Sequence, residues 1–218
     1  MIPDETRKRT YLDEIDEELE PLFDRIRAKP ETDYDLFRRA VLDFHKRTQR
    51  TLDIVELISK GGLAPGGPQH SLKDTIYNLF AYMGLVESVG NVVLDMVVML
   101  LVANGRDFHI ECQHTVPRVK HAVQIGDLED ERVPLTAKLN FLKENGIAVL
   151  ASTIDSDLRN IIAHLKFNIK DNDILIRGRP CNEFILDSSR KLALALGFVI
   201  GKFERFAKEK GIFWEDQA

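Results

Sequence analysis

A mostly apolar stretch runs from Thr75 to Asn104 and is interrupted by two carboxylates, Glu87 and Asp95. Its apolar residues recur at steps of three and four, the period of an α-helix that buries one face. The positions that follow this period are Leu72, Ile76, Leu79, Val86, Leu94, Val97 and Leu101. A helix that spans a membrane needs ~20 nearly uninterrupted apolar residues. The pattern therefore predicts a mainly helical protein with a long core helix over 71–103 and no membrane segment.

Two amphipathic helical patterns precede this core helix. The first covers 5–29, ends before Pro30 and is rich in charge, so we expect an exposed amphipathic helix. Its apolar positions are Leu12, Ile15, Leu19, Leu22, Phe23 and Ile26. The second covers 34–60, and the Gly- and Pro-rich segment after it sustains neither helix nor strand and lacks the Lys-Ser/Thr of a phosphate-binding loop. We therefore divide the chain into a helical arm at 1–60, a hinge at 61–70 and a main domain at 71–211.

Shorter elements follow the core helix. Residues 105–133 show no clean period and predict an irregular segment with short strands, whereas 135–144 predict a helix closed by Asn145 and Gly146. The next helix is expected to begin near Ser152, which stands three residues before Asp155 as in a capping box. A hairpin at 166–169 and 174–177, extended by 183–186, and a last helix at 188–210 complete the chain.

The balance of charge and the cysteines exclude some classes of protein. The net charge is −5, which argues against a protein that coats nucleic acid nonspecifically. A local basic group, Arg118, Lys120 and His121, remains a candidate contact for an RNA backbone. The two cysteines, Cys112 and Cys181, lack the paired spacing of a zinc site or a disulfide framework. Because the cysteines lack that spacing, we expect no bound metal. Unpaired cysteines and first residues without the apolar core of a signal peptide predict a cytoplasmic protein.

The segment Leu158-Arg159-Asn160-Ile161-Ile162-Ala163-His164 lies within the helix expected after Ser152. At ~100° per residue, its apolar residues form one stripe that faces the core. That stripe consists of Ile154, Leu158, Ile161, Ile162 and Leu165. Arg159 and His164 lie on opposite borders of the stripe, ~140° apart around the axis, so a single copy separates them. A two-fold axis would bring the same patch of two chains together and line one cleft with two arginines and two histidines.

These residue types suit the cleavage of a phosphodiester. Histidine exchanges protons near neutral pH, and arginine holds a phosphate and stabilises the charge that grows on it. One histidine would serve as base and the other as acid, with the 2′-hydroxyl of the RNA as nucleophile and no metal required. Asn160 is placed to orient the ring of His164 or of its two-fold mate. On helical geometry alone the alternative is structural: Arg159 pairs with an acid, Asn160 caps a backbone group and His164 is a surface or interface histidine.

The segment resembles the motif of the HEPN (higher eukaryotes and prokaryotes nucleotide-binding) family, in which Arg, often followed directly by Asn, precedes His by four to six residues. The surroundings at 138–143 and 167–173 are similar as well, and the resemblance covers roughly 71–210. It implies a HEPN-like helical bundle with a small β-hairpin after the motif helix. It also implies a homodimeric, metal-independent endoribonuclease, without cofactor, that leaves a 2′,3′-cyclic phosphate in toxin–antitoxin or other stress and defence systems. By this resemblance Arg159 and His164 are catalytic and Asn160 supports them.

The same family leaves other functions open. Its toxins that are inactivated by nucleotidylation carry Tyr two residues after the His, where this chain has Lys166, so that regulation is in doubt. The family also contains noncatalytic binding or assembly proteins, which is the alternative function for this chain. A third possibility is an antitoxin-like protein whose N-terminal helices bind another protein.

Other charged and metal-ligating residues are candidates for a supporting role. Glu87 and Asp95 need partners, because an unpaired buried carboxylate is costly, and we expect one of them to orient Arg159. The alternative for either carboxylate is a purely structural ion pair. His109, Cys112, His114 and His121 lack the tight, paired spacing of zinc ligands. Lys166 joins the basic group at 118–121 as a candidate RNA contact.

Overall fold

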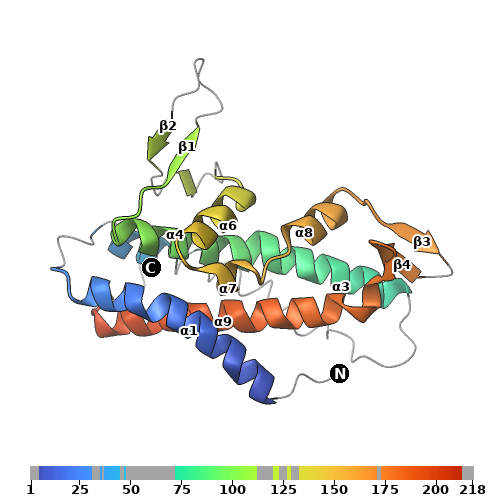
Figure 1. Ribbon diagram of the computed structural model, residues 1–218, viewed down its shortest axis with the longest axis horizontal. Coiled ribbons are helices and arrows are strands. Elements are labelled where there is room, and N and C mark those ends of the chain that lie inside the picture. Colours follow the sequence, from blue (N-terminus) through green and yellow to red (C-terminus); the bar gives the residue numbers. More distant parts are fainter. Residues whose placement is uncertain are drawn as a thin grey trace, which may run out of the picture.

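The computed structural model describes residues 5–30, 35, 37–44, 47, 72–111, 120–122, 127–128, 133–170 and 173–212, with the backbone alone at 5–9, 110–111 and 120–121. The helices are α1 (Glu5–Arg27), α3 (Leu72–Gly84), α4 (Asn91–Ala103), α6 (Leu135–Glu144), α7 (Ala148–Ala151), α8 (Ser156–Ala163) and α9 (Ile185–Glu209), with a π-helical turn η2 (Leu85–Gly90) and a 3-10 turn η3 (Cys181–Glu183). The strands are β1 (His109–Glu111), β2 (Lys120–Ala122), β3 (Asn168–Lys170), β4 (Asp173–Ile176) and β5 (Arg179–Pro180). Residues 37–44 are also helical. The prediction of a mainly helical protein is confirmed (Figure 1).

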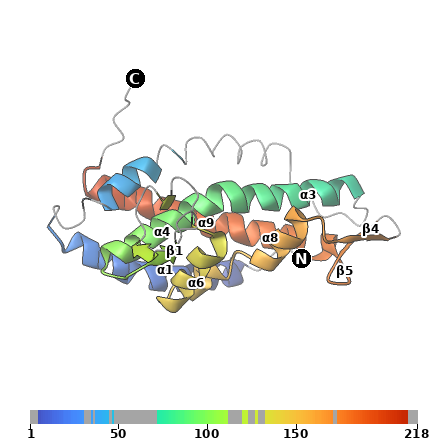
Figure 2. The ribbon, with the colours of Figure 1, turned by 90° about the horizontal axis from the view of Figure 1, so that it is seen from above.

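The core helix predicted over 71–103 is present. The segments α3, η2 and α4 form one continuous helix, Leu72–Ala103, between α9 on one side and α6 and α8 on the other (Figures 1 and 2). Every residue from Val92 to Leu101 is buried. In the part of the chain that the structure describes, this helix alone is long and apolar enough to cross a membrane, and 78% of its most apolar window is buried inside the protein. Burial on all sides from Val92 to Leu101 makes this segment the core of the helical body.

The N-terminal helix α1 belongs to the same hydrophobic core. Ile15, Leu19, Phe23 and Ile26 are fully buried, and the ring of Phe23 meets that of Phe203 of α9 edge-on, with centroids 5.0 Å apart. The expectation of an exposed arm is therefore wrong for α1, because its apolar stripe faces the bundle and not the solvent. The expected hinge at 61–70 lies outside the described residues.

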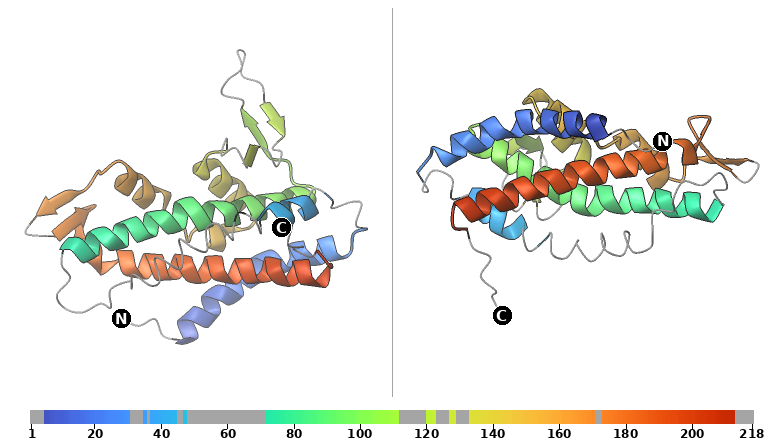
Figure 3. Two further views of the ribbon diagram at one scale, coloured as in Figure 1. Left: turned by 180° about the vertical axis from the view of Figure 1, so that it is seen from behind. Right: turned by 90° about the horizontal axis from the view of Figure 1, so that it is seen from below.

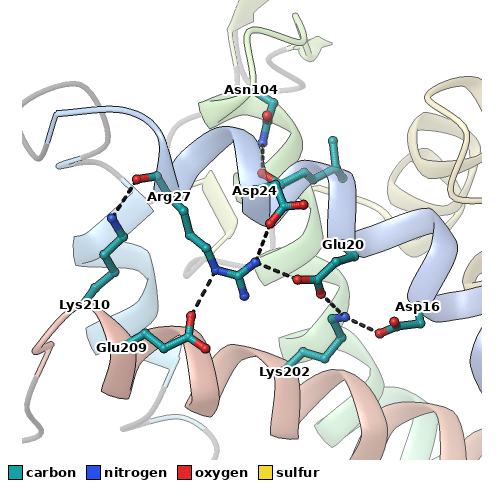
Figure 4. Close-up of polar contacts among 9 residues, drawn as sticks. Asp16, Glu20, Asp24, Arg27, Asn104, Lys202, Glu209 and Lys210 are labelled. Atoms are coloured by element: carbon teal, nitrogen blue, oxygen red, sulfur yellow. Dashed lines mark hydrogen bonds and ion pairs between the residues drawn. The ribbon is translucent and has the colours of Figure 1, made fainter.

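A network of ion pairs fastens α1 to α9 (Figure 4). The ammonium group of Lys202 on α9 pairs with both Asp16 and Glu20 of α1. Arg27 contacts Glu20 at 2.6 Å and Glu209 of α9 at 3.0 Å. Hydrogen bonds from Lys202 and Arg27 lower the pKa of Glu20. The side chain of Lys202 is only 7% exposed, and a buried ammonium group without a partner would be costly. The two carboxylates supply that partner and so hold α1 on the bundle.

Two small antiparallel sheets extend from the helices. Strands β1 and β2 form a hairpin that projects from the helical body, as two views show (Figures 1 and 3). Strands β3, β4 and β5 form the second sheet in that order, at the end of the molecule near the start of α3. Ile174 and Ile176 of β4 are buried, so this sheet closes one end of the core. The hairpin predicted after the motif helix is confirmed in β3 and β4.

The chain after β4 differs from the prediction of a third strand at 183–186. Arg177 and Gly178 both adopt positive φ, at 53° and 76°, and form a tight turn into β5, which comes earlier than predicted. The next residues form η3, and α9 begins at Ile185. The prediction of a strand is wrong because Ile185, Ser189 and Leu192 are buried at helical spacing on one stripe of α9.

Candidate active site

The helix that carries the motif, α8, begins at Ser156, later than predicted. Asp155 is its N-cap, and the Asp155 carboxylate accepts a hydrogen bond from the Leu158 backbone N–H at 2.8 Å. Ser152 instead ends α7 and donates its hydroxyl proton to the Val149 carbonyl at 2.7 Å. The prediction of a start near Ser152 is wrong because Asp155 directly precedes the helix and satisfies one of its free N–H groups. A second acid, Asp157, lies in the first turn of α8 and is a local sequence signal for this start.

A buried tyrosine holds the beginning of α8 against the core helix. The Tyr82 hydroxyl accepts a hydrogen bond from the Asp155 backbone N–H at 3.0 Å and donates one to the Asp155 carbonyl at 3.4 Å. Tyr82 is fully buried, and that burial raises the pKa of its hydroxyl to about 12. From the turn between β4 and β5, the Arg177 guanidinium also reaches the Asp155 carboxylate, at 3.4 Å. Neither Tyr82 nor Arg177 was singled out from the sequence, because nothing local indicates that they meet Asp155.

The other end of α8 lies at the surface. The helix ends at Ala163, His164 is its C-cap, and Leu165 adopts the left-handed conformation with φ 50°. Backbone bonds from Lys166 to Ile161 and from Leu165 to Ile162, at 2.8 and 3.0 Å, close this end in the pattern of a Schellman motif. Leu165, expected on the buried stripe, is 66% exposed, so that part of the prediction is wrong. The reason is that the helix stops two residues earlier, which turns Leu165 away from the core.

Arg159 is held from two sides. Its Nε atom pairs with the Glu87 carboxylate, and its Nη1 atom donates to Oδ1 of Asn160 at 3.0 Å. Glu87 lies in the π-helical turn η2, where the Ser88 hydroxyl donates to the Gly84 carbonyl. A π-helical turn shifts the register of a helix, and such turns are frequent at functional sites. The side chains of Arg159 and Glu87 keep 30% and 39% of their surface exposed, so the pair lies at the edge of the core and within reach of a ligand.

Asp95, the other carboxylate considered as a partner of Arg159, lies in a different environment. It is 3% exposed and contacts Lys138 of α6 at 2.5 Å and Arg47 at 2.8 Å. Burial raises the pKa of the Asp95 carboxyl even though both cations oppose that shift. The Lys138 ammonium also donates to Asn91 at 3.1 Å. The expectation that Asp95 supports Arg159 is therefore wrong, because two other cations already occupy its carboxylate.

His164 and Lys166 lie exposed at the free end of α8. Within the described residues, the His164 ring makes no hydrogen bond or ion pair, and none joins it to Arg159 or Asn160. The exposed ring is therefore accessible to another molecule. Lys166 is exposed beside it, whereas the side chains of Arg118, Lys120 and His121 lie outside the described residues. One chain thus does not join Arg159 to His164, as helical geometry predicts.

The described residues contain no group of three or more His, Cys, Asp or Glu side chains that could hold a metal ion. Cys112 and His114, two of the weak candidates from the sequence, lie outside those residues. Cys181 is buried, and burial raises the pKa of its thiol to about 12, which makes it a poor nucleophile.

No family model, no curated protein and no solved structure matches this chain. Membership of the HEPN family therefore stays a prediction made from the sequence motif.

Proposed function

We propose that the protein is a metal-independent endoribonuclease of the HEPN type that acts as a homodimer in the cytoplasm, in stress or defence. Arg159 and His164 are its catalytic residues, and Asn160 supports them. The observation that carries this proposal is the contrast within the motif: Arg159 is fixed by Glu87 and Asn160, while the His164 ring is exposed and has no hydrogen bond or ion pair with the described residues. Cleavage of a phosphodiester needs both a fixed cation and a proton carrier, which two chains would bring together.

The reaction follows from these two groups. A histidine removes the proton of the 2′-hydroxyl, whose oxygen attacks the adjacent phosphorus. The 5′-oxygen of the next nucleotide leaves with a proton from the second histidine. The products are a 2′,3′-cyclic phosphate and a 5′-hydroxyl end. Arg159 keeps N–H groups that are not used by Glu87 or Asn160, and these stabilise the charge on the phosphoryl oxygens in the transition state.

The dimer is part of the proposal because a single chain does not bring the two catalytic residues together. No hydrogen bond or ion pair connects His164 with Arg159 in the described part of the chain. An isologous contact at the free end of α8 supplies two histidines, one for each proton transfer. The exposed Leu165 and Ile169, at 66% and 60%, give that end an apolar surface for such a contact.

Glu87 is a positioning residue in this proposal. It holds Nε of Arg159, while Nη1 donates to Asn160, so the remaining N–H groups are left for a phosphate. The variant Glu87→Gln removes the charge but keeps a hydrogen-bond acceptor. We expect it to lower the cleavage rate more than it weakens RNA binding, because it loosens the guanidinium and leaves His164 unchanged. Equal rates for Glu87→Gln and the parent would remove Glu87 from the site.

One observation favours a second candidate, a noncatalytic binding or assembly protein. The Glu87 carboxylate already neutralises the Arg159 guanidinium, as in a structural ion pair. In that function the exposed His164 and Leu165 contact another protein and no RNA is cut.

A cleavage assay separates the two functions. Purified protein is incubated with a labelled single-stranded RNA in excess chelator, and the product ends are analysed for 2′,3′-cyclic phosphate. We expect the parent to cut and Arg159→Ala and His164→Ala to lose about 100-fold or more of the rate, the scale of one acid–base or charge-stabilising group. His109→Ala and Arg106→Ala are matched controls, since both residues are exposed and outside α8.

Mixing the two inactive variants tests the dimer. A mixed dimer keeps one arginine and one histidine in the shared cleft, so part of the activity should return. A parent that cuts no RNA under any condition, or cleavage that persists in both variants, contradicts the nuclease and leaves the assembly protein.

A further inference from the structure

The outward face of α9 carries a combination of residues that the interior of the protein does not explain. Ala193, Gly197 and Gly201 are exposed, and Leu194 beside them is 42% exposed. Among the described residues, and apart from the neighbouring backbone of the helix, no heavy atom lies within 4 Å of the point that a Cβ would occupy at either glycine. Glycine weakens the interior of a helix relative to alanine, and no described residue of the same chain comes close enough to require it.

The large and small residues of this face complement each other about Gly197. At ~100° and 1.5 Å per residue, an antiparallel copy of α9 that crosses at Gly197 sets Leu194 against the partner's Gly201. The same axis sets Ile200 against the partner's Ala193. Each large side chain then meets a small one, which lets two helices approach closely.

The charges at the two ends of the face provide a second, independent observation. Arg190 lies seven residues before Gly197 and Glu204 seven residues after it, on the same side of the helix. Neither side chain makes an ion pair or hydrogen bond with the residues that the structure describes. The antiparallel copy places Arg190 beside the partner's Glu204 and Lys208 beside the partner's Asp187. A parallel copy would instead place like charges together.

We infer that the face of α9 formed by Arg190, Ala193, Leu194, Gly197, Ile200, Gly201 and Glu204 binds a second copy of this chain, in an antiparallel contact with its two-fold axis at Gly197. The occupant is a second copy because the face matches itself in both size and charge. This contact goes beyond the proposed nuclease, because α9 lies across the side of the molecule away from α8 (Figures 1 and 3). Together with a contact between two α8 helices, it would assemble more than two chains.

A charge exchange tests the contact on the full chain. The mass of the assembly is measured over a range of concentrations by analytical ultracentrifugation. Arg190→Glu and Glu204→Arg should each raise the dissociation constant about tenfold or more, because each places two like-charge pairs across the axis. The double variant Arg190→Glu/Glu204→Arg should restore the parent's value. Arg106→Glu and Glu144→Arg, at exposed positions outside α9, serve as matched controls.

A cross-link tests the position of the axis. In a chain with Cys112→Ser, the Gly197→Cys variant should form a disulfide-linked dimer on mild oxidation, because residue 197 meets its own copy. The Lys208→Cys variant should not, since position 208 faces position 187 of the partner. A monomeric parent at all concentrations, charge variants without effect, or equal cross-linking at 197 and 208 would overturn the inference. RNA cleavage is a separate readout, so failure of the α9 contact leaves the nuclease test unaffected.

Discussion

The two ends of α8 are built in opposite ways. Its beginning is fixed at Asp155, which caps the helix and contacts both the buried Tyr82 hydroxyl and the Arg177 guanidinium. Its end has an exposed histidine, a leucine in the left-handed conformation and an exposed lysine. The first end stabilises the fold, and the second costs stability, since Leu165 both strains the backbone and exposes an apolar side chain.

This contrast indicates which end of α8 is the candidate functional surface. Residues that stabilise the fold need no further explanation. Leu165 lowers the stability of the fold and lies exposed next to His164, so stability does not explain why a leucine stands there. The catalytic proposal therefore depends on the free end of α8, and substitutions at the two ends should have effects of opposite kind.

The largest expected effect is a loss of stability at alkaline pH, where the Tyr82 hydroxyl at the beginning of α8 loses its proton. Burial raises the pKa of Tyr82 from 10.0 to about 12, so the folded state holds this proton more tightly than the unfolded state. The stabilisation is complete below pH 10 and is lost as the pH rises through the folded value of about 12, by about 3 kcal/mol in all. Urea unfolding between pH 8 and 12 measures it. The Tyr82→Phe variant should show a shallower decline, although Tyr11, whose pKa is also raised to about 12, keeps part of it.

At neutral pH, Tyr82→Phe should destabilise the protein by about 2 kcal/mol. The substitution removes two hydrogen bonds to Asp155 and leaves its backbone N–H without a partner among the described residues, whereas the Asp155 carbonyl still accepts from the Arg159 backbone N–H. The free energy of unfolding in urea gives the value. A variant as stable as the parent would show that the beginning of α8 does not depend on Tyr82.

Asp155→Ala should cost about 1 kcal/mol, the typical loss of an N-cap. Ser152→Ala is the matched comparison, because Ser152 was the start predicted from the sequence and it only bonds the Val149 carbonyl. Its cost should stay within about 0.5 kcal/mol, as at ordinary surface positions. If Ser152→Ala were the more destabilising of the two, the helix would begin where the sequence pattern placed it.

At the free end of α8, a substitution should raise the free energy of unfolding instead of lowering it. Leu165→Gly should stabilise the protein by about 1 kcal/mol, because glycine adopts φ 50° without strain. Leu165→Ala keeps the strain and removes the exposed side chain, so it should change stability little. We expect both variants to lose RNA cleavage, since both remove the apolar surface beside His164. A stabilised Leu165→Gly variant with full activity would show that Leu165 has no role in the site.

The smallest effect is expected for Arg177→Ala. Its contacts with Asp155 and Asp157, at 3.4 and 3.5 Å, are long, and the side chain is 52% exposed. Such surface pairs contribute about 0.5 kcal/mol or less. A change in the midpoint of thermal unfolding measures it, and a loss as large as that of Tyr82→Phe would mean that the arginine is part of the fixed end.

Much of the secondary structure could be predicted because it is encoded locally. The helix expected at 135–144 has those bounds in the structure, and the core helix and last helix agree within a few residues. Periodic apolar positions and a terminal Asn-Gly pair are local signals that do not depend on distant contacts. The prediction of a strand at 183–186 is wrong because a short apolar run fits both the strand and the helix period, and packing against the core favours the helix.

The candidate site could be predicted only in part. The sequence indicated Arg159, Asn160 and His164 and required partners for Glu87 and Asp95. It did not indicate which carboxylate meets Arg159, since both lie on one long helix. The structure decides this through the π-helical turn at Glu87 and through Lys138 and Arg47, which approach Asp95 from elsewhere in the chain.

The sequence alone therefore determined which segments are helical, which residues carry the motif and that one helix keeps its Arg and His apart, because these depend on spacing along the chain. Only the tertiary structure decided that α1 joins the core, that Tyr82 fixes the beginning of α8 and that its end stays exposed. Those outcomes depend on which buried groups find partners far away in sequence, and the cost of leaving such groups unpaired is settled only when the whole chain packs.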